Sequence, residues 1–216
     1  MLLQELVGGK YNKITMRNVR RLMGYELITM DEYGTTAVYV KDDVVSCTPI
    51  RIQSTGTPKE AIQAAAVIIP TTGVIRNRRQ LVFVSFYLSP NSRDAVKSMD
   101  SVEGILDQIR SATADRAPNV IIGGDVNIWS EQIGSDLFNR AVSGYNWKYE
   151  AGDRLHSVMW DQKMCCITNR EPTMWKSDTD GSRREFAVDT LWVTDALPQH
   201  ADIQSRFDRS VQITDQ

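Results

Sequence analysis

Short apolar runs, separated by polar and glycine-containing turns, dominate the chain from its first residues. A run of about four to eight apolar residues between turn residues is typical of a β-strand that is buried in a sheet. The pattern predicts strands at residues 1–6, 33–40, 61–69, 80–87, 120–122, 165–168 and 187–193. Residues 73–79, between two of these runs, have the polar composition of a hairpin tip.

One segment, residues 91–113, has the periodicity of a helix. Its apolar residues recur at helical spacing, at Val96, Met99, Val102, Ile105, Leu106 and Ile109. Ser92 and Arg93 are expected to open this helix. Residues 14–22 have the polar-rich pattern of a second, solvated helix. Strand-rich halves around one long helix predict an α+β sandwich, and the absence of a linker or repeat predicts a single domain over residues 1–216.

The segment NVIIGGDVNIWS, residues 119–130, ends a predicted strand with two polar side chains. Gly123 and Gly124 allow backbone geometries closed to other residues. If the extended geometry persists, Asp125 and Asn127 project together, because alternate residues of a strand share a face. A carboxylate orients or deprotonates a water, and a neutral amide binds a phosphoryl oxygen without repelling it. The segment favours phosphate-ester hydrolysis, although an ordinary strand-to-loop turn would use the same residue types.

The composition is that of an ordinary globular protein, with 42% hydrophobic and 24% charged residues among 216. No apolar run approaches the roughly 18–20 residues of a membrane span, and residues 1–10 do not resemble a signal peptide, so no membrane partner is expected. The net charge of −2 disfavours tight non-specific binding of nucleic acid. Any affinity for DNA must therefore come from local basic patches, such as residues 76–79 and the pair Arg183 and Arg184.

Missing motifs exclude several classes of enzyme. The chain has no dinucleotide-binding glycine motif, P-loop, nucleophile elbow or zinc-protease motif. Cys47, Cys165 and Cys166 have neither zinc-site nor disulfide spacing and are expected to be buried thiols in a reducing compartment. The only histidines, His156 and His200, are expected at the surface, and two histidines exclude a multi-histidine metal site. Any metal must be held by carboxylates and water, which indicates Mg²⁺ or Mn²⁺.

Four segments, in order along nearly the whole chain, resemble motifs of the endonuclease/exonuclease/phosphatase superfamily. LLQE at residues 2–5 is similar to the strand that ends in a metal-binding glutamate. VSFYLSP at residues 84–90 is similar to the strand with a tyrosine before a proline. GDVN at residues 124–127 matches the motif Gly-Asp-x-Asn, and AVDTL at residues 187–191 resembles the late strand that carries an aspartate.

Within the superfamily, the chain is most similar to the apurinic-type endonuclease domains of non-LTR retrotransposons. Residues 127–135, NIWSEQIGS, align without a gap on the pattern Asn-Ala-His-Ser-x-x-Trp-Gly-Ser, and depart from it at Ile128, Trp129 and Ile133. Residues 169–173, NREPT, resemble the pattern Asn-x-x-x-Pro-Thr, with one residue fewer between the asparagine and the proline. The motifs expected of inositol-phosphatase relatives are absent.

The resemblance implies a four-layered α/β sandwich of two mixed β-sheets flanked by helices, the DNase I-like fold. It implies a Mg²⁺- or Mn²⁺-dependent endonuclease that nicks DNA and leaves a 3′-hydroxyl primer for a reverse transcriptase elsewhere in the parent polyprotein. Glu5 would bind the metal, Asp125 would orient the attacking water, and Tyr87 and Asn127 would hold phosphate oxygens. Asp189 would fix a histidine or asparagine of the site by a hydrogen bond. An active element implies an intracellular and nuclear location.

Both ends of the sequence depart from the family pattern and lead us to expect a partial copy. Members carry an asparagine-bearing strand before the glutamate and a terminal Ser-Asp-His. Either Asp215 is the aspartate of that motif and Gln216 replaces its histidine, or the motif lay beyond the last residue. Two alternatives to an active endonuclease stay open: a catalytically impaired remnant, and a phosphoesterase of the same fold that acts on a small molecule or lipid. Trp192 is expected to pack in the core rather than to stack on bases.

Overall fold

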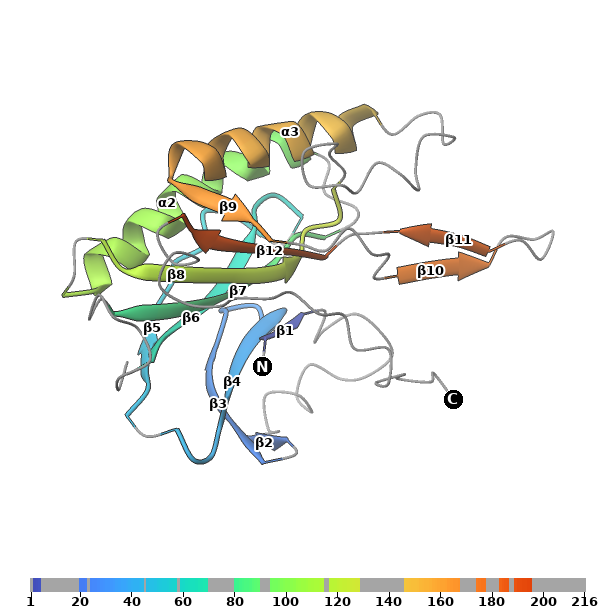
Figure 1. The fold of residues 1–216 in the computed structure, drawn as a ribbon. Helices are drawn as coiled ribbons and strands as arrows, with labels where there is room; N and C mark the ends of the chain where they lie inside the picture. The colour runs from blue at the N-terminus through green and yellow to red at the C-terminus, as the bar shows by residue number, and fades with distance from the viewer. Residues whose placement is uncertain are drawn as a thin grey trace.

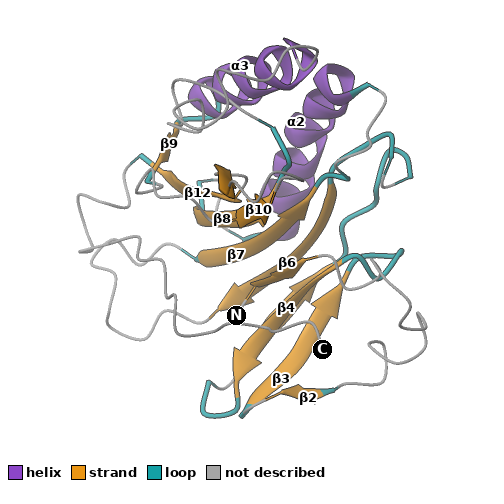
Figure 2. Ribbon diagram, turned by 90° about the vertical axis from the view of Figure 1, so that its right-hand side faces the viewer, coloured by secondary structure: helices purple, strands orange, loops and turns teal. Residues whose placement is uncertain are grey.

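In the computed structural model two β-sheets pack face to face, and helices α2 and α3 cover the outer face of the larger sheet (Figure 1, Figure 2). The structure describes residues 2–4, 20–22, 24–44, 46–57, 59–69, 80–89, 94–114, 117–128, 146–167, 174–177, 183–186 and 189–195. Within these ranges neither helix carries a stretch long and apolar enough to cross a membrane.

The larger sheet has the strand order β5-β6-β7-β8-β12-β9 in the described part of the chain. Its strands are β5 (Thr48–Ile50), β6 (Gln63–Ile69), β7 (Leu81–Tyr87), β8 (Asn119–Asp125), β12 (Asp189–Thr194) and β9 (Met164–Cys166). β7 and β8 pair parallel, and the other neighbours pair antiparallel. Parallel neighbours need a crossover connection, and α2 (Ala95–Ala112) lies in it.

The smaller sheet has the order β1-β4-β3-β2, and its described strands pair antiparallel. These strands are β1 (Leu2–Gln4), β2 (Arg21–Leu22), β3 (Tyr25–Met30) and β4 (Thr36–Lys41). A separate antiparallel hairpin, β10 (Met174–Ser177) and β11 (Arg183–Phe186), projects away from the two sheets just before β12 (Figure 1).

The predicted strands are confirmed, with shifted ends, at β1, β4, β6, β7, β8, β9 and β12. Residues 14–19 of the predicted solvated helix and the hairpin tip at residues 73–79 lie outside the described residues. The end of that predicted helix is wrong, because Arg21 and Leu22 form β2 and pair with β3. The opening of the long helix is also shifted: its N-cap is Asp94, whose side chain accepts a hydrogen bond from the backbone N–H of Lys97 at 3.2 Å.

The main core lies between the larger sheet and the helices. α2 buries one face, and α3 (Asn146–Asp161), which the sequence pattern did not predict, lies beside it. The side chains buried between the helices and the sheet include Val84, Phe86, Met99, Ile105, Ile122, Leu155 and Trp192. Burying a side chain of this size stabilises a fold by about 1.5–3 kcal/mol. The helix-covered face therefore fixes the positions of β7, β8 and β12.

A second core joins the two sheets. It contains Val38 and Val40 of β4 and Ala65 and Val67 of β6. Together with the helices, these contacts confirm the predicted α+β sandwich of two sheets. The larger sheet is mixed, as the resemblance implies, whereas the described strands of the smaller sheet pair only antiparallel. The resemblance also implies a helical layer over the outer face of the smaller sheet. The described residues do not test that part of the prediction.

The turn from β3 to β4 is built around the buried carboxylate of Asp31, which is 6% exposed. Its oxygens accept hydrogen bonds from the backbone N–H groups of Tyr33, Thr35 and Thr36 at 3.0, 2.6 and 2.7 Å. The hydroxyl of Thr35 also donates to it at 3.0 Å. A buried carboxylate is tolerated only with such partners, so this residue fixes the start of β4.

We expect Asp31→Ala to lower the free energy of unfolding by about 2 kcal/mol, because it leaves buried backbone donors without an acceptor. Urea denaturation of both proteins measures the change. The matched control is Asp42→Ala, since Asp42 is an exposed carboxylate in the turn that follows β4, at the other end of this strand. The control should stay within about 0.5 kcal/mol of the unchanged chain. Equal stability of the two variants would contradict a structural role for the Asp31 carboxylate.

Candidate active site

Three of the predicted site residues lie side by side at one end of the larger sheet. Tyr87 of β7 is the register partner of Asp125 of β8, and Asp125 is the register partner of Asp189 of β12. Residues directly opposite one another in neighbouring strands share a face of the sheet. The pairing of three strands therefore gathers positions that are far apart in the sequence.

These three positions belong to the face that packs on the smaller sheet. Two residues before Asp125, a Cβ on Gly123 would lie 2.8 Å from Leu2 Cδ1 of β1. Two residues before Tyr87, Ser85 accepts a hydrogen bond from the hydroxyl of Thr36 at 2.6 Å. Thr36 in turn is the register partner of Gln4, the last residue of β1. The end of β1 therefore lies on the same side of the larger sheet as Asp125.

Of the two glycines before Asp125, Gly124 is required by close approach of the backbone. A Cβ on Gly124 would overlap the backbone carbonyl oxygen of Phe86 and lie 2.7 Å from its carbonyl carbon. A Cβ on Gly123 would instead meet the end of the flexible Leu2 side chain. Gly124 thus lets the backbones of β7 and β8 approach closely at the end of the sheet, next to the pair Tyr87 and Asp125.

A turn, rather than a continued strand, brings Asp125 and Asn127 together. The strand continues past the glycines to Asp125, but Asn127 has φ = 51°, so the condition for a shared strand face is not met at Asn127. The Asn127 backbone N–H donates to Asp125 Oδ1 at 3.0 Å. Asparagine tolerates positive φ better than most residues. The Asp125 side chain therefore closes a short loop onto the backbone of Asn127.

Leu88 connects this turn to β7. Its backbone N–H donates to the carbonyl oxygen of Asp125 at 3.0 Å. Its carbonyl oxygen accepts a bond from Asn127 Nδ2, also at 3.0 Å. Asn127 is 7% exposed and Tyr87 is 9% exposed, whereas Asp125 is half-buried. The amide of Asn127 is therefore held in one orientation with a second N–H still to donate, beside a carboxylate that solvent reaches.

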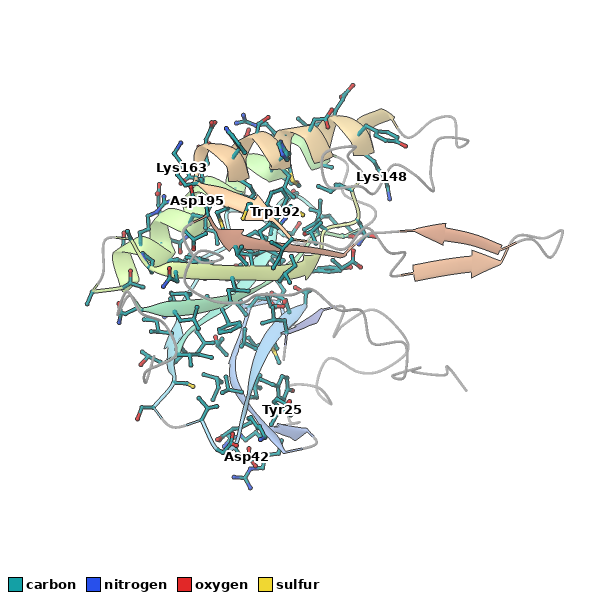
Figure 3. The ribbon with its side chains drawn as sticks, viewed as in Figure 1. Tyr25, Asp42, Lys148, Lys163, Trp192 and Asp195 are labelled. Carbon is teal, nitrogen blue, oxygen red and sulfur yellow. The ribbon has the colours of Figure 1, made fainter. Side chains whose placement is uncertain are left out.

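The sequence analysis did not single out Lys148, on which the charge of Asp125 acts. It lies in the first turn of α3 and is 9% exposed (Figure 3). Burial lowers the pKa of Lys148 below its usual value, and the negative charge of Asp125 partly opposes this shift. The sequence does contain a feature that could have drawn attention to Lys148. This lysine stands at the start of an amphipathic helix, whose apolar residues Ala151, Leu155 and Val158 recur at helical spacing.

Other predictions about single residues are confirmed, corrected or untested. Trp192 is 1% exposed and belongs to the core, as predicted. His156 is half-buried rather than at the surface: its ring stacks on Trp160 with centroids 6.3 Å apart and lies 6.1 Å from the ring of Trp192. Asp189 is the first residue of β12, and its backbone position in the sheet is described. Some predictions stay untested, because their residues lie outside the described part of the chain. These residues are Glu5, His200, Asp215, Gln216 and 76–79.

The three cysteines are free thiols and half-buried, less buried than expected. Burial raises the pKa of the thiols of Cys47 and Cys165. The basic pair Arg183 and Arg184 lies in β11 of the projecting hairpin.

The donor groups at this end of the sheet fit a hard divalent cation. Carboxylate and amide oxygens are ligands that Mg²⁺ and Mn²⁺ accept, and Asp125 and Asn127 supply both kinds. Among the described residues, no group of three or more His, Cys, Asp and Glu side chains is close enough to hold a metal ion. The predicted ligand Glu5 follows Gln4 directly along the chain, and Gln4 is the end of β1.

A family model described as "Endonuclease-reverse transcriptase" matches residues 81–210, well over half of the chain. The chain belongs to this family. The match begins at Leu81, the first residue of β7. It includes Asp125, Asn127, Lys148 and Asp189. The predicted membership of the endonuclease/exonuclease/phosphatase superfamily is thereby confirmed. A search of curated proteins gives no match to the sequence.

Solved structures have a similar fold. The endonuclease domain of TRAS1, a telomere-specific non-LTR retrotransposon, superposes with a TM-score of 0.57 at 17% identity, over 82% of this chain and 70% of that one. D. rerio TDP2 complexed with a single-strand DNA product gives 0.51 at 13% identity, over 89% and 69%. An AP endonuclease from Archaeoglobus fulgidus gives 0.50 at 12% identity, over 92% and 76%. At these identities the likeness shows the fold.

Proposed function

We propose that this member of the endonuclease–reverse transcriptase family is a metal-dependent DNA endonuclease that nicks DNA and leaves a 3′-hydroxyl primer for reverse transcription. The observation that carries the proposal is the hydrogen-bonded turn of Asp125 and Asn127, held against β7 by Leu88. It places a solvent-accessible carboxylate next to a fixed neutral amide. Hydrolysis of an anionic phosphodiester needs a base for the attacking water and a neutral donor to a phosphate oxygen, and these two groups can serve as them.

Each side chain has a distinct part in this proposal. Asp125 accepts the Asn127 N–H on Oδ1, and its carboxylate would orient the attacking water and take its proton. Asn127 donates its second amide N–H to a non-bridging phosphate oxygen, and the Tyr87 hydroxyl donates to another. Asp189, opposite Asp125 in the strand register, fixes a further site residue by a hydrogen bond.

A divalent cation, Mg²⁺ or Mn²⁺, would be held by Glu5 together with water. When bound, such an ion polarises the phosphate and stabilises the leaving 3′-oxygen. Superfamily members generally depend on divalent metals, and the oxygen donors described above suit such an ion. The metal's identity and its ligands in this chain belong to the proposal.

The substrate and the partners are part of the same proposal. The solved structure of TRAS1 is an endonuclease domain of a retrotransposon, and the TDP2 structure holds a single-strand DNA product, which supports DNA as the substrate. The family description joins an endonuclease to a reverse transcriptase, which supports a polymerase in the parent polyprotein. A chain that acts on chromosomal DNA would work inside the cell, in the nucleus.

Analysis of the nicked product tests this function. The purified chain is incubated with supercoiled plasmid and Mg²⁺, and the open circles are offered to a DNA polymerase without end repair. We expect direct extension from the nick, which requires a 3′-hydroxyl. Extension only after phosphatase treatment would contradict the primer role. Hydrolysis of p-nitrophenyl phosphate without nicking would favour a small-molecule phosphoesterase, and inactivity on both substrates would favour an impaired remnant.

A further inference from the structure

Lys148 occupies a position that is unfavourable for a cation on two counts. A positive charge in the first turn of a helix opposes the helix dipole, whose amino-terminal end is itself positive. A buried ammonium also loses its hydration, and Lys148 is only 9% exposed. A lysine is retained in such a place without loss of stability only when negative charge lies near it. Among the described residues, the carboxylate of Asp125 is a negative charge near enough to act on the Lys148 ammonium.

The residues that follow Asp125 pack in the same core as α3. Val126 and Ile128 are fully buried and belong to the core that contains Ala151 and Leu155 of α3. The segment that leaves β8 therefore lies on the side of the larger sheet that α3 covers. Figure 3 shows Lys148 below the first turn of α3, on the side that faces the larger sheet. The ammonium is thus directed toward the end of the sheet that holds the candidate site.

We propose that Lys148 is a phosphate-binding residue of this site, whose ammonium contacts a non-bridging oxygen of the DNA phosphodiester beside Asp125. This inference rests on the proposed function. It is supported by the charges present: a phosphodiester bound beside Asp125 would bring a second negative charge next to its carboxylate. A cation at this end of the sheet would reduce the repulsion between them as the phosphate binds.

The salt dependence of DNA binding distinguishes a phosphate contact from a purely structural role. Each neutralised phosphate contributes about 0.9 to the slope of log K against log salt concentration for duplex DNA. Binding of a fluorescein-labelled duplex is measured by anisotropy at several NaCl concentrations, with EDTA present so that no cleavage occurs. We expect Lys148→Met to reduce the slope by about 0.9 and to weaken binding, whereas Lys148→Arg retains the slope.

Lys163→Met is the matched control, because it removes the same charge from an exposed lysine just beyond the other end of α3 (Figure 3). Its slope should equal that of the unchanged chain. Circular dichroism and thermal unfolding of each variant establish that it is folded.

Two outcomes would overturn the inference, and they are distinguishable. If the unchanged chain binds DNA and Lys148→Met keeps the full slope, Lys148 does not contact phosphate, and a lowered melting temperature in that variant would assign it a structural role instead. If the unchanged chain does not bind DNA at any salt concentration, the proposed function fails and this inference fails with it.

Discussion

Replacing Asp125 by asparagine is expected to lower the rate of Mg²⁺-dependent plasmid nicking by about 10²–10⁴-fold, the usual contribution of a positioned acid or base. The substitution separates chemistry from structure. An asparagine side-chain oxygen still accepts the backbone N–H of Asn127, the bond that Asp125 makes at 3.0 Å. It cannot take a proton from water. The turn should therefore survive while the reaction is lost, as measured by the first-order rate of conversion of supercoiled to open-circular plasmid.

Asp42→Asn is the control for this experiment, because Asp42 is an exposed carboxylate in the turn at the far end of the smaller sheet (Figure 3). It should nick at the rate of the unchanged chain, and both variants should keep its circular dichroism. If Asp125→Asn nicks as fast as the control, Asp125 has only the structural role of accepting the Asn127 N–H, and the proposed mechanism is wrong.

Gly124→Ala is expected to lower the free energy of unfolding by about 3 kcal/mol, the upper part of the usual cost of forcing an extra methyl group into a packed site. The new Cβ would overlap the carbonyl oxygen of Phe86, and a backbone atom in a paired strand cannot move aside as a side chain can. For a chain of this size the loss corresponds to a melting temperature lower by about 6–12 °C. Differential scanning calorimetry measures it.

Two other glycines make a graded series of controls. In Gly123→Ala the new Cβ would meet only the end of the Leu2 side chain, so the loss should be smaller. In Gly104→Ala it would have no atom within 4 Å, and the residue lies inside α2, so stability should rise by about 1 kcal/mol. Close approach of β7 and β8 is supported if the free energy of unfolding falls from Gly104→Ala to Gly123→Ala to Gly124→Ala. A Gly124→Ala variant as stable as Gly104→Ala would contradict it.

Much of the fold could be predicted because its central strands are buried on both faces. β6, β7 and β8 are covered by helices on one side and by the smaller sheet on the other, so they form nearly continuous apolar runs. β3 was not predicted, because its residues are half-buried or, at Glu26, exposed, and leave only a weak pattern. α3 was not predicted, although Ala151, Leu155, Val158 and Met159 follow helical spacing, because polar residues and Gly152 interrupt the run.

The members of the site could be predicted better than its geometry. Asp125 and Asn127 are only two positions apart in the sequence, so their proximity followed from any compact local structure. The alignment of Tyr87 and Asp189 with Asp125 depends on strand register, which is set by pairing between distant segments and cannot be derived from one segment alone. The left-handed backbone of Asn127 and the position of Lys148 likewise depend on tertiary packing.

The most direct test of the central claim is plasmid nicking by the unchanged chain with its metal supply controlled. Supercoiled plasmid is incubated with the purified protein after treatment with EDTA, and then with Mg²⁺ or Mn²⁺ added back in excess. We expect no conversion in EDTA and conversion to open circles when either ion is restored, with Asp125→Asn slower by about 10²–10⁴-fold. Nicking that persists undiminished in EDTA, or equal nicking by Asp125→Asn, would mean that this chain is not the metal-dependent endonuclease proposed above.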